Sequence, residues 1–369
     1  DTHARFRFSS DTSINANTPS GAGSDWEVED YQVVINPDPT PPTTSCPAGS
    51  LLAEQTILNF QNPTPEPGTT NGDYSVGSIY RFANVTTNVD AIVEVIANNN
   101  ASIVELDIST TGLASSFQPE VRSNSTTPGE YSVDFQISFV QSGTSTQVNL
   151  DNLLATSVDT DGDNTVVREF VRFSGNSPNF YTIENPSKLT ASQIDSTTVR
   201  LESQSTDVNP GINLTTANMG SVKYDQVVTF NYRAGLIIGN NPPANIANQR
   251  LNSLYFECVS YNNPDTTTAT TLFTDYGDAP SSYGDASHTY SQTPTVYLGS
   301  NIDDESATQL GGDAGATASG DDTDGTDDDD GISSFPSLVE GETSYKIPAG
   351  NITATGTGTL HAWVDFDKN

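Results

Sequence analysis

Apolar residues fall on every second position in several segments of this 369-residue chain, and no other sequence feature limits its possible folds as tightly. In residues 132–139 valine, phenylalanine and isoleucine alternate with polar residues, and residues 228–233, 4–8 and 360–366 show the same pattern. A period of two places one set of side chains on a core face and the other in solvent. No segment shows a sustained helical period. The pattern therefore predicts an all-β protein of antiparallel β-sandwich modules joined by Pro/Thr-rich linkers.

Two stretches of linker composition divide the chain. Residues 37–45 are rich in proline and threonine, and residues 262–271 are rich in asparagine and threonine. They separate a short β piece, residues 1–36, and a final acidic β piece, residues 272–369, from a central β-sandwich body, residues 46–261. The body is long enough to bury a core of its own.

The two cysteines, Cys46 and Cys258, stand at the two ends of the predicted body. A lone pair in an extracellular chain usually forms a disulfide, and closing so long a loop stabilises a fold by about 4–5 kcal/mol on the chain-entropy argument. Two free buried thiols are the alternative. No stretch approaches the roughly 18 apolar residues needed to span a bilayer. No signal peptide stands at Asp1, so we expect a mature chain or a window from a longer one.

The charge balance excludes one class of partner. The chain has 13 Lys+Arg residues against 47 Asp+Glu residues, which gives a formal net charge of -34. Such a surface repels phosphate backbones and anionic membranes, so we expect no nucleic-acid partner. Divalent cations are the natural counter-charge, and Ca²⁺ is the cofactor that we predict.

Motifs in both flanking pieces carry a family resemblance. The first piece reads Trp-Glu-Val-Glu-Asp-Tyr at residues 26–31. The last carries Asp-Tyr-Gly-Asp-Ala-Pro at 275–280, Asp-Asp-Asp-Asp-Gly-Ile at 327–332 and the alternating segment 360–366. These pieces resemble the GEVED domains of bacterial surface proteins, although Trp26 stands where that family usually has glycine. The resemblance implies a β-sandwich module of large, repetitive, adhesin-like secreted proteins, often associated with calcium and without catalytic activity.

The densest acidic run, residues 320–331, is the main candidate for calcium binding. Ca²⁺ takes six to eight oxygen ligands in flexible geometry, and Asp-x-Asp-Gly spacing lets a loop curl around it, although the run does not match an EF-hand. The candidate ligands are Asp321, Asp322, Asp324, Asp327, Asp328, Asp329 and Asp330, with Asp303, Asp304 and Glu305 to complete the shell. A solvated acidic loop is the alternative.

Two smaller acidic motifs are further candidates for calcium. Asp159, Asp161 and Asp163 form an Asp-x-Asp-Gly-Asp loop between two strand signals. A hairpin turn is the alternative, because Asp-Gly is a strong turn signal, and both interpretations could hold. Asp365 and Asp367 resemble the opening half of a calcium loop.

The sequence gives little support to catalysis, and we expect no enzyme. The body contains no histidine, so it cannot hold a Ser-His-Asp or Cys-His arrangement. No nucleophile elbow or zinc-binding His-Glu-x-x-His motif occurs. Binding of surface glycans through exposed aromatic side chains is the main rival to a structural role, although a tyrosine in a strand is more often core. The candidates for it are Tyr74, Tyr80, Tyr181 and Tyr224.

The two flanking pieces are each expected to be incomplete, and residues 1–36 contain the kind of ending that residues 272–369 lack. The expected assembly residues are Phe6, Phe8, Glu27, Val28, Glu29, Asp30 and Tyr31. Completion within one chain, donation to the next subunit and continuation in tandem repeats all remain open. We favour completion between successive units, so other copies of the chain are the expected partners. The expected function is that of a structural repeat in an extracellular bacterial fibre, stalk or giant adhesin at the cell surface.

Overall fold

The computed structural model divides into two compact units, Asp1–Thr40 and Pro41–Asn369. The structure describes residues 2–9, 26–33, 41, 43–209, 211–212, 214–246, 248–277, 286–291, 294–300, 302, 330–337 and 345–362. In residues 2–9 and 26–33 it describes the backbone alone.

The first unit contains an antiparallel hairpin. Strand β1 (Thr2–Ser9) pairs with β2 (Trp26–Val33) along its whole length. In this register Phe6 lies opposite Glu29 and Phe8 lies opposite Glu27. Among the described residues no third strand joins the ribbon, and an isolated pair of strands is at best marginally stable in water.

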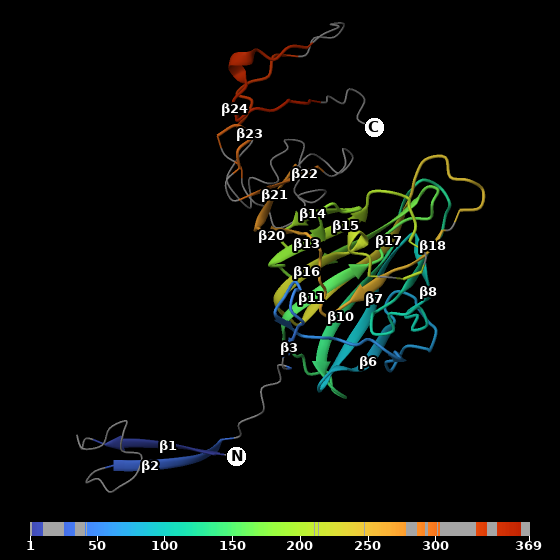
Figure 1. Cartoon of the computed structure of the whole chain (residues 1–369). Coiled ribbons are helices and arrows are strands. Elements are labelled where there is room, and N and C mark those ends of the chain that lie inside the picture. The colour runs from blue at the N-terminus through green and yellow to red at the C-terminus, as the bar shows by residue number, and fades with distance from the viewer. Residues whose placement is uncertain are drawn as a thin grey trace. The chain divides into compact units, whose positions relative to one another are not determined.

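The second unit is built around an antiparallel sheet of eight strands (Figure 1). In spatial order these are β14 (Leu189–Asp195), β15 (Thr198–Ser203), β12 (Val167–Ser174), β17 (Thr229–Ile238), β10 (Gly129–Gln141), β7 (Val89–Asn99), β6 (Ile79–Thr86) and β5 (Thr64–Pro65). Spatial neighbours such as β12 and β17 are distant in sequence. The register between strands therefore decides which side chains meet.

A second antiparallel sheet packs against one face of the first. Its order is β19 (Ser253–Tyr255), β11 (Leu150–Val158), β16 (Gly220–Val227), β13 (Phe180–Glu184) and β20 (Pro264–Thr268). The ring centroids of Tyr224 on β16 and Phe230 on β17 lie 6.0 Å apart, and both side chains are fully buried. The two sheets share one core, and the predicted all-β, antiparallel sandwich is confirmed.

Shorter elements complete the described part of this unit. They are the three-stranded sheet of β18 (Gln249–Leu251), β9 (Glu120–Ser123) and β8 (Ala101–Glu105), the pairs β3 (Thr44–Ser45) with β4 (Glu54–Gln55), β21 (Leu272–Tyr276) with β22 (Ser287–Ser291) and β23 (Tyr297–Leu298) with β24 (Ala354–Thr355), and the 3-10 turns η1 (Thr216–Asn218) and η4 (Ala349–Asn351). Within the described ranges no helix has the length and apolar character needed to cross a membrane.

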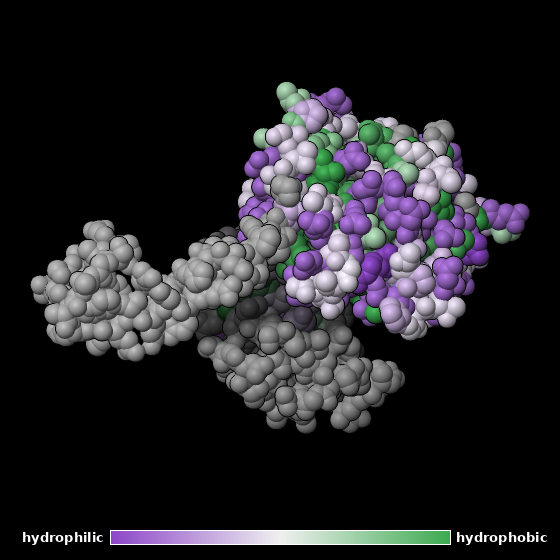
Figure 2. All heavy atoms as spheres, turned by 90° about the horizontal axis from the view of Figure 1, so that it is seen from below, coloured by the Kyte–Doolittle hydropathy of each residue, from purple (hydrophilic) through white to green (hydrophobic). Residues whose placement is uncertain are grey.

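The predicted alternation is clearest in β10. Every second side chain from Val133 to Phe139 is fully buried. On the opposite face Asp134 forms an ion pair with Arg233 of β17. Figure 2 shows the same division at the surface, where hydrophilic residues cover much of the visible face of the body and hydrophobic ones lie between them.

Two segments differ from their predicted state. The linker expected at residues 262–271 contains β20, whose Thr266 lies opposite Thr182 of β13. β-Branched threonines suit a strand, and a proline is tolerated as the first residue of an edge strand, which is the position of Pro264. Leu360 to Ala362, the described part of the strand expected at residues 360–366, lie outside any strand.

The predicted disulfide between Cys46 and Cys258 is present. The two Cα atoms lie 5.7 Å apart although the cysteines are separated by 212 positions in sequence. Nearby, the side-chain amide of Gln55 donates a hydrogen bond of 3.0 Å to the carbonyl of Phe256. The start of the sandwich and the segment just before its last strand, β20, are therefore joined covalently and by a hydrogen bond at the same place.

Candidate functional site

The acidic loop at residues 159–163 connects the two sheets of the sandwich. It leaves β11 of the five-stranded sheet and enters β12 of the eight-stranded sheet. The loop is therefore not a hairpin turn between β11 and β12, which do not pair, but Gly162 forms an antiparallel bridge with Arg168 at the start of β12. Asp159 turns the chain out of β11 with a φ of 60°, a left-handed conformation that Asp adopts more readily than most residues. A side chain at Gly162 would collide with the backbone of Thr206.

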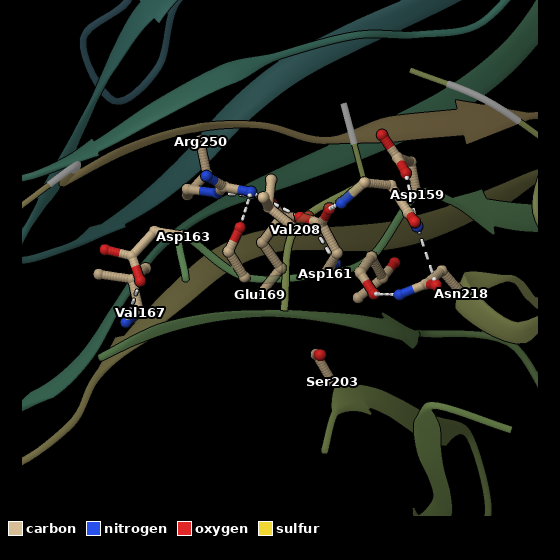
Figure 3. A network of polar contacts seen from close by, with 12 residues as sticks. Asp159, Asp161, Asp163, Val167, Glu169, Ser203, Val208, Asn218 and Arg250 are labelled. Carbon is tan, nitrogen blue, oxygen red and sulfur yellow. Dashed lines mark hydrogen bonds and ion pairs between the residues drawn. The ribbon is translucent and has the colours of Figure 1, made fainter. Parts of the chain in front are cut away.

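A single arginine from another sheet occupies the space between the acids of this loop (Figure 3). The Nη2 atom of Arg250 on β18 donates to Asp161 Oδ1 at 2.6 Å and to the carbonyl of Gly162 at 2.8 Å. Its Nε atom donates to Glu169 Oε1 on β12, also at 2.6 Å. The side chains of Asp161 and Glu169 are each 3% exposed, and that of Arg250 is 15% exposed. The result is a buried ionic cluster with well-formed charge-assisted hydrogen bonds.

Two asparagines extend the cluster toward Asp159. The backbone N–H of Asn209 donates to Asp161 Oδ2 at 2.5 Å, and its side-chain amide donates to Asp159 Oδ1 at 3.4 Å. The same amide donates to Asn218 Oδ1 at 2.9 Å, and Asn218 in turn donates to the carbonyl of Thr160 at 3.0 Å. The loop is therefore held by polar contacts to Asn209 and to Asn218 of η1.

Asp163 has a different role from its two neighbours. Its Oδ1 atom accepts hydrogen bonds from the backbone N–H groups of Thr165, at 2.8 Å, and Val167, at 2.9 Å. These bonds cap the start of β12, and hydrogen bonds from the Thr165 side chain and from both backbone groups lower the pKa of Asp163 despite partial burial. Figure 3 shows Asp163 with Val167, apart from Asp159.

The buried acids outnumber their basic partner. Burial raises the pKa of Asp159 to about 7, and the charge of Asp161 raises it further. Burial also raises the pKa of Glu169, while the Arg250 guanidinium opposes that rise. Two carboxyl groups pair with the guanidinium of Arg250 and a third, that of Asp159, lies near them without a basic partner of its own among the described residues, so the cluster holds a proton or a surplus negative charge near neutral pH.

Calcium binding by Asp159, Asp161 and Asp163 stays a prediction. In the part of the chain that the structure describes, no three His, Cys, Asp or Glu side chains form a group that could hold a metal ion. A calcium ion bound by this loop would have to compete with the guanidinium of Arg250 for Asp161. In this structure Asp161 of the loop is therefore part of an internal ion-pair site.

Most of the predicted calcium ligands in residues 272–369 lie outside the described residues. These are Asp321, Asp322, Asp324, Asp327, Asp328, Asp329, Asp303, Asp304, Glu305, Asp365 and Asp367. Asp330 is described, and its Oδ1 and Oδ2 atoms accept hydrogen bonds of 2.8 and 3.1 Å from the backbone N–H of Ser300. Gly299 has a φ of 77°, and a side chain there would collide with the Asp330 carboxylate. The structure thus brings Leu298–Gly299 and Asp330–Gly331 side by side.

The tyrosines considered for glycan binding belong to the core. Tyr80 and Tyr224 are 2% and 0% exposed, and Tyr74 and Tyr181 are partly buried against the same core cluster. These four side chains therefore do not form the exposed aromatic platform that sugar stacking would use.

Sequence reasoning missed Arg250 and Glu169, the partners that define the ionic cluster. Glu169 stood in a strand signal and Arg250 in an unremarkable segment, and neither has an acidic motif of its own. The available signal was the scarcity of bases: with 13 Lys+Arg residues in the chain, each is a candidate partner for a buried acid.

Comparison with known proteins gives limited similarity. No family model matches the chain, and no curated protein matches it. Among solved structures, the chain is similar to the N-terminal domain of the adhesin Sgo0707 from Streptococcus gordonii, with a TM-score of 0.36 and 11% identity. The similarity covers 60% of this chain and 66% of that chain. The GEVED resemblance of the flanking pieces rests on their motif residues.

Proposed function

We propose that the chain is a non-catalytic structural module of an extracellular bacterial fibre, stalk or large adhesin. The observation that carries the proposal is the covalent bond between Cys46 and Cys258, which encloses every strand of the two sheets except β20. A disulfide of this kind is typical of proteins that leave the reducing cytosol, which supports a location at the cell surface.

The disulfide gives the sandwich a specific mechanical property. While the bond is intact, a force applied to the chain outside Cys46 and Cys258 cannot extend the residues between them. Without the bond, the intervening 212 positions would extend by about 700 Å when the sandwich unfolds, at the chain's reach of roughly 3.3–3.6 Å per residue. A module that cannot lengthen in this way suits a load-bearing rod.

Single-molecule stretching of the full chain tests this role. The oxidised protein should show no unfolding step of about 700 Å. A variant with both cysteines changed to serine should show one, because the folded sandwich is short compared with the same residues fully extended. A step of the same size in the oxidised protein would refute the proposed load path.

Assembly is proposed to occur through the β1–β2 ribbon. Its two strands pair only with each other among the described residues, and the outer edges of a two-stranded ribbon offer backbone groups for further pairing. The partner is proposed to be the acidic final piece of a neighbouring copy, residues 272–369, with calcium bound in its acidic run. Deletion of residues 1–36 should abolish end-to-end assemblies in electron micrographs while the disulfide-bonded sandwich stays folded. Normal assembly of the deletion variant would contradict this linking role.

A further inference from the structure

The outer face of the eight-stranded sheet gathers arginines in a chain that has few. Arg200 on β15 lies opposite Arg172 on β12, and Arg172 lies opposite Arg233 on β17. Their neighbours along the strands, such as Val171 and Tyr232, are buried in the core, so the three arginines share the outward face. Like charges directly opposite one another destabilise a sheet, and the row therefore requires compensation.

The two outer members of the row have close acidic partners. Arg200 donates to Glu130 at 2.6 and 3.2 Å, and it also pairs with Glu202 at 2.7 Å. Arg233 donates to both carboxylate oxygens of Asp134, at 2.5 and 2.7 Å. These pairs neutralise the two ends of the row.

The central arginine has no such partner. The nearest carboxylate oxygen in an ion pair with Arg172 is Glu130 Oε2, 3.9 Å from its Nη2 atom, and Glu130 is already bound by Arg200. The Nε atom of Arg172 is buried and has no hydrogen-bond partner. Burial and the charges of Arg200 and Arg233 lower the pKa of Arg172. An unpaired buried donor is costly, and Arg172 is therefore the least compensated arginine of the row.

Arg172 lines a recess that could accept an anionic group. The recess has a volume of about 160 Å³, and its lining includes Ile96, Asp134, Asn231, Asp195 and Thr198 beside Arg172. A single water needs about 10–15 Å³, so there is room for several heavy atoms. The recess is nevertheless smaller than the roughly 300–1,000 Å³ of a typical small-molecule pocket. One small ligand unit fits this description better than an extended chain.

We propose that this recess binds one acidic sugar unit, with its carboxylate on Arg172. A guanidinium matches the planar carboxylate. The amide of Asn231 and the hydroxyls of Thr198 and Ser174 provide hydrogen-bonding groups for sugar hydroxyls, and Ile194, 39% exposed, provides apolar surface at the rim. The lining of the recess includes no residue of the disulfide, the β1–β2 ribbon or the acidic run, so this proposal does not depend on the mechanical role proposed above.

Ligand-observed NMR titration of the full chain tests the assignment, with sodium glucuronate and galacturonate as probes. Glucose and galactose are the neutral controls, sodium acetate and sulfate represent anions alone, and N-acetylglycine represents a peptide carboxylate. The uronates should bind, and R172Q should weaken their binding at least tenfold. The matched variant is R168Q: Arg168 lies on the same strand but pairs with Glu202 and is not part of the recess lining. It should bind like the original protein.

Several results would overturn the proposal. R172Q could bind the uronates unchanged, or the neutral sugars could bind equally well. Equal binding of acetate, sulfate or N-acetylglycine would assign the recess to anions or peptide ends instead of acidic sugars. The melting temperature of R172Q shows whether the variant is folded. We expect it to equal or exceed that of the original protein, because the substitution removes a repelling charge, and weakened binding is then not due to loss of folding. R172K provides a second check: it keeps the charge but loses the bidentate geometry, so it should bind more weakly than the original protein.

Discussion

Replacement of Arg250 by methionine should destabilise the sandwich severely. Arg250 is the basic partner of both Asp161 and Glu169, through two hydrogen bonds of 2.6 Å, and the two acid side chains are each 3% exposed. Removal of one partner from a buried ion pair leaves an uncompensated charge and typically costs about 3–5 kcal/mol. Because two buried acids lose their partner, we expect the free energy of unfolding at pH 7 to decrease by an amount within that range.

Urea denaturation followed by circular dichroism, with the disulfide intact, measures this loss. R122M is a suitable control, since Arg122 lies on β9 opposite Gln249, the residue next to Arg250, but forms its hydrogen bonds at an exposed position. It should change stability by less than about 0.5 kcal/mol.

A triple variant separates buried charge from packing. Addition of D161N and E169Q to R250M removes the stranded carboxylates, and it should recover a large part of the loss because no uncompensated charge is then left at these two positions. A loss below about 1 kcal/mol in R250M, or a triple variant no more stable than R250M, would refute the claim that the ion pairs, rather than the shape of the side chain, join β18 to β12 and the 159–163 loop.

Three further predictions concern the disulfide, calcium and pH. Changing both Cys46 and Cys258 to serine should lower the free energy of unfolding by about 5 kcal/mol, the chain-entropy value for so long a loop; unchanged urea midpoints would contradict this. Excess calcium should raise the melting temperature and a chelator should lower it, with magnesium as the control, because a ligand of the folded state alone stabilises that state; identical melting curves would exclude the site. Burial raises the pKa of Asp107 and of Asp159 to about 7, so between pH 4 and 7 the folded protein holds protons that the unfolded chain releases. Their contribution to stability is therefore fully present near pH 4 and is lost as the pH rises to 7; D107N should reduce this slope, and an unaltered slope would assign it to other groups.

The sequence by itself determined the class of fold and the disulfide. The alternation from Val133 to Phe139 is a local property, because successive side chains of any strand point to opposite faces. The two cysteines were predictable since both stand at the ends of one body and a lone extracellular pair usually bonds. The acidic character of residues 320–331 is likewise explicit in the sequence, although its calcium ligands stay a prediction.

The tertiary structure decided where charges meet. Asp161 and Arg250 are far apart in sequence, and only the crossing of the 159–163 loop between the sheets brings them within 2.6 Å. The row of Arg200, Arg172 and Arg233 depends on the register of three strands, and a slip of one residue would have turned these side chains to the other face. Register and strand order are set by the summed burial of the whole core, so no local pattern in the sequence contains them.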